Sequence, residues 1–271
     1  MQKITTFSAA IVLTAMFAAA AAAQVPLQTG IRILYAEDAR SFNSDLVKFL
    51  ASKSAAVRAR AALAAGRIGR KDAIPALTKL LSDKDEKVRL NAAFALGEIE
   101  SSDAAETLLA AMTKESSIAV RSRVLEALGK IAAANPKADG AAKIKDAIKT
   151  LLNAELAKAG KRDRETVLLG LTALIRTRPD GADAIAARFL DDSDARVRAD
   201  AGNTLTRLRA KNANAKLIDL VKTEPDPIAR ANAARALGAA GAKEAIALLL
   251  SVAASDKDSR VRISAVRSLA S

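Results

Sequence analysis

Few residues in this chain of 271 could carry out chemistry on their own. The sequence contains no His and no Cys, which removes an imidazole base, a thiolate nucleophile and the commonest ligands of zinc. A serine nucleophile would need a lysine base, and no Ser-x-x-Lys spacing occurs. Neither a P-loop nor a Gly-x-Gly-x-x-Gly motif is present. We therefore expect no catalytic residues, no metal ligands and no cofactor.

The charged residues that recur with regular spacing are arginines. Marker arginines follow one another at intervals of 31 to 34 residues, apart from one interval of 43, and they are Arg58, Arg89, Arg121, Arg164, Arg198, Arg230 and Arg262. An acid usually stands six residues before the marker, at Asp83, Glu115, Asp192, Glu224 and Asp256, whereas Ser52 and Lys158 break the pattern. Such acids and arginines can pair within a repeat or between stacked repeats. We expect a structural ladder of partly exposed pairs, each worth at most about 1 kcal/mol; a ligand site is the alternative.

Each marker lies at the start of a repeated helical segment. Residues 57–68 return as residues 88–99, with apolar positions that follow the helical period. A residue able to cap a helix precedes most copies, at Ser54, Asp85, Ser117, Asp194, Asp226 and Asp258. Glycines near the end of the segment, at Gly66, Gly97, Gly129 and Gly238, would serve close packing or a C-cap.

A shorter apolar segment precedes each marker segment, as at residues 73–81 and 245–250. We call the shorter segment the first helix of a pair and the marker segment the second helix. Pro75 suits the first turn of such a helix, where its missing N–H costs nothing. One helix pair cannot bury its own apolar face, but stacked pairs can. The sequence therefore predicts an all-α solenoid of about seven helix pairs, with alanine at the positions where helices approach closely.

The repeated pattern Asp-x-x-Val-Arg-x-x-Ala-Ala-x-Ala-Leu-Gly-x-Ile, clearest at residues 85–99, resembles the HEAT repeat, especially the bacterial HEAT-like subclass named after phycobilisome lyases. The resemblance covers residues 44–271 and is poorest in the fourth copy. It implies a right-handed α-α superhelix of the HEAT/armadillo-like kind whose concave surface is lined by the second helices. It does not imply lyase chemistry.

A softer resemblance concerns residues 31–40 followed by the repeats. This order is similar to exported bacterial proteins in which such an array precedes a cyclophilin-type prolyl isomerase domain. The chain has no segment like that domain, and its catalytic His has no counterpart. The last repeat stops at Ser271 without a C-cap or a polar capping repeat, so we expect a truncated chain, or further repeats or a domain in the parent protein.

The first residues have the character of a secretory signal peptide over residues 1–23. Lys3 is followed by an apolar run at residues 11–17 and by the small residues Ala21, Ala22 and Ala23. Cleavage would leave Gln24 first, a lead-in segment at 24–43 and the repeats at 44–271. An uncleaved membrane anchor is the alternative, although the run is short for a span. We expect a periplasmic or extracellular protein.

The second helices offer candidate partner-binding positions at offsets of 3, 6 and 10 residues after the position just before the marker arginine, which is Val57 in the first copy. These candidates are Arg60, Leu63, Arg67, Asn91, Phe94, Arg123, Lys130, Asn203, Arg207, Asn232, Arg235 and Arg267. Basic residues beside exposed Leu63 and Phe94 would suit an acidic peptide or protein segment. Alternatively, Leu63 and Phe94 pack beneath the segment that contains Tyr35.

The net charge of +13 also suggests nucleic acid or an anionic surface as a binding partner. Export, the lack of an aromatic stacking platform and the interleaving of acids with bases argue against nucleic acid. Weak attraction to an anionic envelope surface is the more plausible use of the charge. An insertion at residues 132–140, with Lys158, Lys161, Arg162 and Arg164 beyond it, reads as a solvated loop or as a protruding edge that touches a partner.

Overall fold

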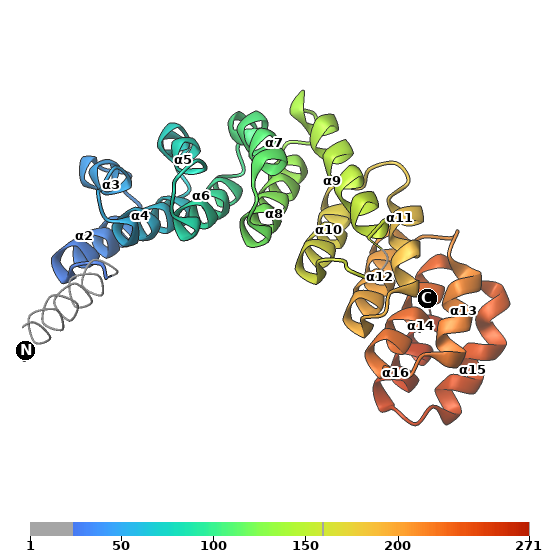
Figure 1. Cartoon of the computed structure of the whole chain (residues 1–271). Coiled ribbons are helices and arrows are strands. Elements are labelled where there is room, and N and C mark those ends of the chain that lie inside the picture. The colour runs from blue at the N-terminus through green and yellow to red at the C-terminus, as the bar shows by residue number, and fades with distance from the viewer. Residues whose placement is uncertain (1–23, 159, 271) are drawn as a thin grey trace, which may run out of the picture. The chain divides into compact units, whose positions relative to one another are not determined.

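The computed structural model describes residues 24–158 and 160–270, all of whose regular structure is helical (Figure 1). The signal-peptide prediction for residues 1–23 falls outside these residues. The chain forms two compact units, residues 1–127 and 128–271, which divide within a helix. None of the described helices is long and apolar enough to cross a bilayer.

Helix α2 (Leu27–Asp38) precedes seven helix pairs. The first helices of the pairs are α3 (Ser44–Leu50), α5 (Ile74–Leu80), α7 (Ala105–Lys114), α9 (Gly140–Leu156), α11 (Ala182–Arg188), α13 (Asn214–Thr223) and α15 (Ile246–Ser255). The second helices are α4 (Ala55–Ile68), α6 (Glu86–Ile99), α8 (Ile118–Ala134), α10 (Arg164–Thr177), α12 (Ala195–Leu208), α14 (Pro227–Ala240) and α16 (Ser259–Leu269). Short 3-10 turns η1 (Lys71–Ala73), η2 (Ser102–Ala104), η3 (Phe189–Asp191) and η4 (Lys243–Ala245) complete the elements. The predicted all-α solenoid is confirmed.

The starts of the second helices are set by the predicted caps. The side chain of Asp85 accepts a hydrogen bond from Val88 N at 3.1 Å, and that of Asp226 accepts one from Ala229 N at 2.9 Å. The same kind of bond caps the helices after Ser54, Ser117, Asp194 and Asp258. Each bond satisfies a backbone N–H that the helix itself leaves free.

The second helices stack along seams of glycine and alanine. A Cβ atom at Gly66 would lie 2.6 Å from the Cα atom of Ala95, and one at Gly238 would lie 2.5 Å from the Cβ atom of Ser268. Real Cβ atoms cannot approach so closely, so the predicted packing role of these glycines is confirmed. The C-cap role falls to other residues, such as Gly241, whose φ is 66°.

The lead-in segment at residues 24–43 and the insertion at residues 132–140 both contain helix that was not predicted from the sequence. The lead-in contains α2, which packs against α4. The predicted loop at residues 132–140 is shorter, because α8 continues to Ala134 and α9 begins at Gly140. Most of the extra length of this repeat is therefore absorbed by two helices of 17 residues each.

Candidate protein-binding surface

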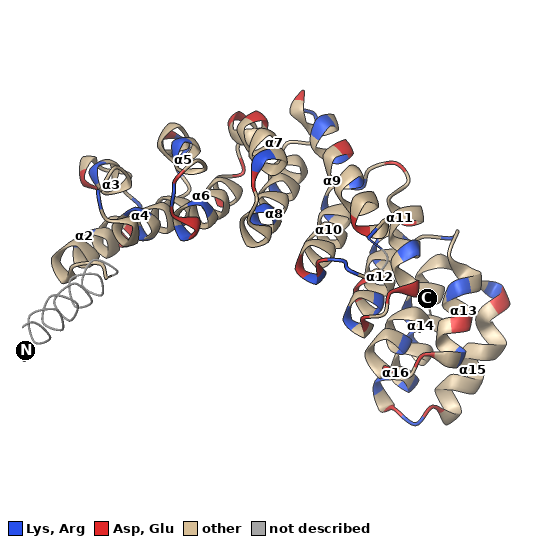
Figure 2. Ribbon diagram, viewed as in Figure 1, with Lys and Arg blue, Asp and Glu red and all other residues tan. Residues whose placement is uncertain are grey.

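The ladder pairs form between stacked repeats, each arginine reaching the acid of the following repeat. The pairs are Arg58–Asp83 at 2.7 Å, Arg89–Glu115 at 2.7 Å, Arg198–Glu224 at 2.6 Å and Arg230–Asp256 at 2.8 Å. Both acidic and basic residues are found at turns between helices (Figure 2). The ladder thereby fixes the register in which one repeat sits on the next.

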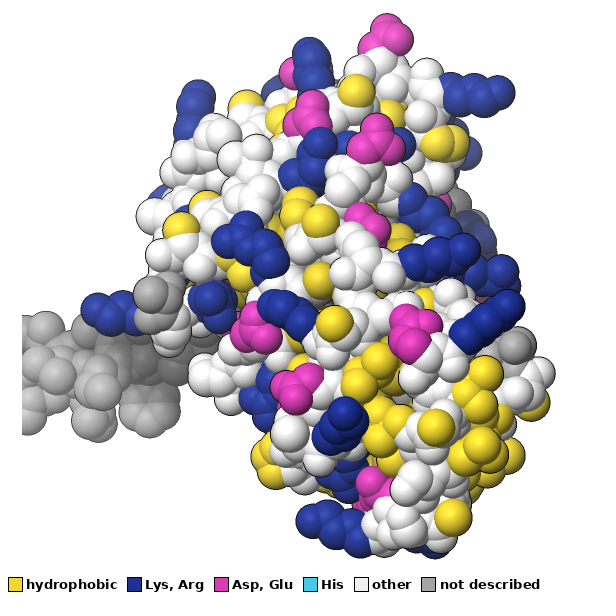
Figure 3. All heavy atoms as spheres, turned by 90° about the vertical axis from the view of Figure 1, so that its right-hand side faces the viewer, with side chains coloured by type: hydrophobic (Ala, Val, Ile, Leu, Met, Phe, Trp, Pro, Cys, Tyr) yellow, Lys and Arg dark blue, Asp and Glu magenta, His cyan; other side chains and the backbone are white. Residues whose placement is uncertain are grey.

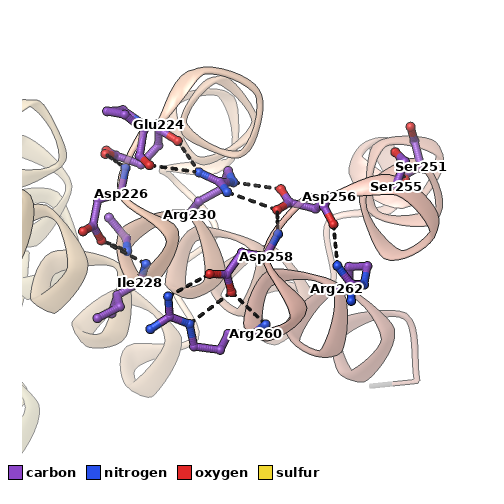
Figure 4. A network of polar contacts seen from close by, with 12 residues as sticks. Glu224, Asp226, Ile228, Arg230, Ser251, Ser255, Asp256, Asp258, Arg260 and Arg262 are labelled. Atoms are coloured by element: carbon purple, nitrogen blue, oxygen red, sulfur yellow. Dashed lines mark hydrogen bonds and ion pairs between the residues drawn. The ribbon is translucent and has the colours of Figure 1, made fainter.

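Each of these arginines also ties down its own turn. Nη1 of Arg230 donates to the carbonyl oxygen of Glu224 at 2.5 Å, while Nε and Nη2 donate to the two carboxylate oxygens of Asp256 at 2.8 and 3.0 Å (Figure 4). The side chains of Arg230 and Asp256 are only 6% and 10% exposed. The pairs are thus more buried than the sequence suggested, and the expected limit of about 1 kcal/mol for removing a partner no longer applies.

The carboxylates of Asp256 and Glu115 stay charged because of these bonds. The hydrogen bonds from Arg230, helped by the backbone N–H of Asp258, lower the pKa of Asp256 against the opposing effect of burial. At Glu115, burial raises the pKa, but the bonds from Arg89 and the backbone N–H of Ser117 outweigh it and the net pKa is lowered. The guanidinium pKa of Arg230 is raised by the same pairing.

The fourth rung differs from the prediction. Arg162, rather than Arg164, reaches Asp192, at 2.7 Å. Asp163 caps α10, so Val167 stands where the other repeats carry their arginine, and Arg162 supplies the guanidinium from before the cap. Arg164 lies 3.6 Å from Asp194 with its side chain 65% exposed. The assignment of Arg164 to the ladder is therefore wrong.

Two predicted ladder arginines have no carboxylate partner among the described residues. Arg121 donates to the carbonyl oxygen of Glu115 at 3.3 Å, and its buried Nε has no hydrogen-bond partner. Arg262 repeats the backbone bond, to the carbonyl oxygen of Asp256 at 2.7 Å, but pairs with no described acid (Figure 4).

Exposed apolar side chains lie on the last pair of helices, α15 and α16, at Ile246, Leu250, Ile263 and Val266. Figure 3 shows this end of the chain, with hydrophobic side chains gathered at the lower right.

In the N-terminal unit, the predicted binding arginines already have carboxylate partners. Both oxygens of Glu37 accept hydrogen bonds from Arg60 at 2.7 Å, and Arg67 reaches the same carboxylate at 3.5 Å. The bonds from Arg60 lower the pKa of Glu37, so this carboxylate stays charged. Arg123 pairs with Glu126. Arg60 and Arg67 therefore tie α4 to α2, whereas the pair of Arg123 lies within α8.

The other N-terminal candidates are half-buried. Asn91 donates to the carbonyl oxygen of Ala59 at 2.8 Å, which ties α6 to α4. The ring of Phe94 faces the guanidinium of Arg123 at 5.9 Å from its centroid. Leu63 is also half-buried, whereas Tyr35 is 75% exposed. Leu63 and Phe94 are therefore not the exposed apolar anchors that binding of an acidic peptide was expected to use.

In the C-terminal unit, one candidate is misplaced. Asn232 is only 6% exposed, and its side chain donates to the carbonyl oxygen of Ala199 at 2.7 Å. The prediction that Asn232 faces a partner is therefore wrong, because this offset points at the neighbouring second helix. Asn203 and Lys130 are half-buried.

The remaining candidates, Arg207, Arg235 and Arg267, are exposed. They line one hollow of about 930 Å³. The same hollow contains three basic residues that the sequence analysis missed, which are Arg178, Arg209 and Lys211. Arg178 and Arg209 are C-cap residues in the left-handed conformation, with φ of 44° and 54°. Their position just after a second helix is the signal that could have found them.

Comparisons with known proteins agree with this architecture. A family model described as HEAT repeats matches residues 43–129, 79–171 and 182–270. The solved complex of CpcE and CpcF of phycocyanin lyase from Nostoc sp. PCC7120 is similar to 83% of this chain over 85% of its own, with 22% identity and a TM-score of 0.52. An engineered protein is similar to 92% of this chain over 71% of its own, with 22% identity and a TM-score of 0.56. Comparison with curated protein sequences finds none that matches.

Proposed function

The chain belongs to the HEAT-repeat family, and we propose that it is a non-catalytic scaffold that binds protein through the exposed side of its second helices. One observation carries this proposal. The ladder and the seams occupy the sides of the second helices that meet their neighbours, while Arg207, Arg235 and Arg267 line a common hollow and pair with no described acid. Basic side chains that lack a carboxylate partner and stand in a fixed array suit recognition of another chain.

The proposal includes export. A basic start, an apolar run and three small residues before Gln24 support cleavage of a signal peptide. The mass of the protein purified from the envelope of its own host tests this point. We expect a chain that begins at Gln24, and a mass that includes residues 1–23 would contradict cleavage.

Site-specific photocrosslinking in the native host tests the scaffold itself. A photoreactive residue placed at Arg207 or Arg267, on second helices, should give a discrete crosslinked product that contains another protein. The same residue at exposed Lys222 or Ala247, on first helices, is the control and should give no such product. Equal crosslinking at all four positions, or none at any, would overturn the proposal.

A further inference from the structure

The hollow in the C-terminal unit carries charge of one sign only. Its basic lining residues are Arg178, Arg207, Arg209, Lys211, Arg235 and Arg267. The rest of its lining is Thr206, Gly238, Ala239, Ala240, Gly241 and Ser268, so no acid takes part. We call this site the basic hollow. At residues 83–87, by contrast, acids and bases are interleaved.

None of the six cations forms an ion pair with a described acid. Nη2 of Arg178 donates to the carbonyl oxygen of Arg207 at 3.0 Å, and Arg235 donates to the side-chain oxygen of Asn232. Those two bonds orient guanidinium groups without neutralising them. In the N-terminal unit, by contrast, Arg60 and Arg67 share the carboxylate of Glu37. All six cations of the basic hollow therefore lack a carboxylate partner among the described residues.

Helix ends explain only part of the cluster. A cation near a helix C-terminus gains about 0.3–1 kcal/mol from the helix dipole, and the effect is confined to the last turn. Arg207 and Arg267, in the last turns of α12 and α16, fit that explanation, as do Arg178 and Arg209, just beyond α10 and α12. Arg235 does not, because α14 continues to Ala240. Placing like charges together in one hollow is unfavourable unless an anion joins them.

We propose that the basic hollow binds an acidic segment of a partner protein, a stretch with several Asp or Glu residues. This inference rests on the proposed scaffold function. Guanidinium groups bind carboxylates with paired hydrogen bonds, as Arg230 does with Asp256 inside the ladder. The lining contains no aromatic side chain on which a base could stack, which favours a peptide over single-stranded nucleic acid.

The test is fluorescence anisotropy with the chain from Gln24 onward and a labelled peptide composed of Asp and Glu. Two variants of equal net charge are compared. The hollow variant carries Arg207→Glu, Arg235→Glu and Arg267→Glu, and the control variant carries Lys222→Glu, Lys243→Glu and Lys257→Glu at exposed positions of the same unit. Thermal unfolding followed by circular dichroism verifies that both variants are folded.

We expect the hollow variant to bind the acidic peptide about ten-fold or more weakly than the control variant. We also expect no binding of the matched Asn/Gln peptide, and binding of the acidic peptide that weakens with salt. Equal affinity in the two variants would overturn the inference. A single-stranded oligonucleotide that binds more tightly than the peptide, and is lost in the hollow variant, would overturn it in favour of nucleic acid.

The two proposals fail in different ways. If the peptide does not bind while photocrosslinking at Arg207 still captures a protein, the acidic-segment inference is lost and the scaffold function stands. If photocrosslinking captures nothing while the peptide binds, the scaffold function is lost and the hollow remains an anion site.

Discussion

Arg230 on α14 holds Asp256 of the next repeat through two hydrogen bonds of 2.8 and 3.0 Å, while its remaining nitrogen holds the carbonyl oxygen of Glu224 in its own turn. One side chain thus joins two turns from successive repeats. The same arrangement recurs at Arg58, Arg89 and Arg198. Because the acids come from the following repeat, the ladder resists sliding of one repeat along another.

Removing Arg230 should destabilise the protein by about 3 kcal/mol, because Asp256 is left as a buried charge without its partner. Arg262→Ala is the matched control, since Arg262 makes the same backbone bond but pairs with no described acid. Urea unfolding of Arg230→Ala and Arg262→Ala should therefore show a much larger loss for the first. Equal losses would mean that the backbone bond, and not the carboxylate, is what matters.

Acid should weaken the ladder. The pKa of Asp256 is lowered in the folded state, so its contribution is fully present above the unfolded pKa of about 3.9 and is lost as the pH falls toward the folded value. The free energy of unfolding should thus be steady near neutral pH and fall below about pH 4. Asp256→Asn should be less stable at neutral pH but lose less on acidification. Parallel pH curves for the two proteins would contradict this assignment.

The glycine seam gives a steric prediction. Gly238→Ala would place a Cβ atom 2.6 Å from the Cα atom of Ser268, so α14 and α16 must move apart, and we expect a loss of about 2 kcal/mol. Gly30→Ala on α2 is the control, because its nearest contact would be Val25 at 3.9 Å. That substitution should be neutral or slightly stabilising, as alanine favours helix. Thermal unfolding of both variants decides the matter, and a stable Gly238→Ala protein would refute the close seam.

The corrected fourth rung can be tested with two neighbouring residues. Arg162→Ala should destabilise the protein, because Asp192 is 7% exposed and loses its partner. Arg164→Ala should change stability by less than about 0.5 kcal/mol, because its side chain is 65% exposed. Chemical unfolding of the two variants gives their free energies of unfolding. A larger loss in Arg164→Ala than in Arg162→Ala would show that Arg164 is the ladder residue after all.

The fold could be predicted from the sequence because local signals and the repeat agree. Each cap residue fixes the start of a second helix, and the glycines mark where helices meet. The residues of the ladder could be named for the same reason, since both types recur in most repeats, but the sequence could not decide between pairing within a repeat and pairing between repeats. The ladder arginine of the fourth repeat was not predicted, because Val167 occupies the usual arginine position. Arg162, which precedes the helix, pairs with Asp192 instead.

The binding surface was only partly predictable. The helical period predicts that offset 3 faces outward, but Asn91 and Asn232 both donate to a carbonyl oxygen of the preceding second helix, at 2.8 and 2.7 Å. Burial of the ladder was also underestimated, because a single repeat does not show how completely its neighbours cover it. Arg207, Arg235 and Arg267 were found, whereas their neighbours at the helix ends were not.

The central claim is that the arginines divide into a buried set that stacks repeats and an exposed set that binds a partner. Arg230 and Arg235 lie on the same helix and represent the two sets. The most direct measurement is the melting temperature and the acidic-peptide affinity of Arg230→Gln and Arg235→Gln, side by side. We expect Arg230→Gln to lower the melting temperature and Arg235→Gln to weaken binding with no loss of stability. An Arg235→Gln protein that melts early or binds unchanged would contradict the central claim.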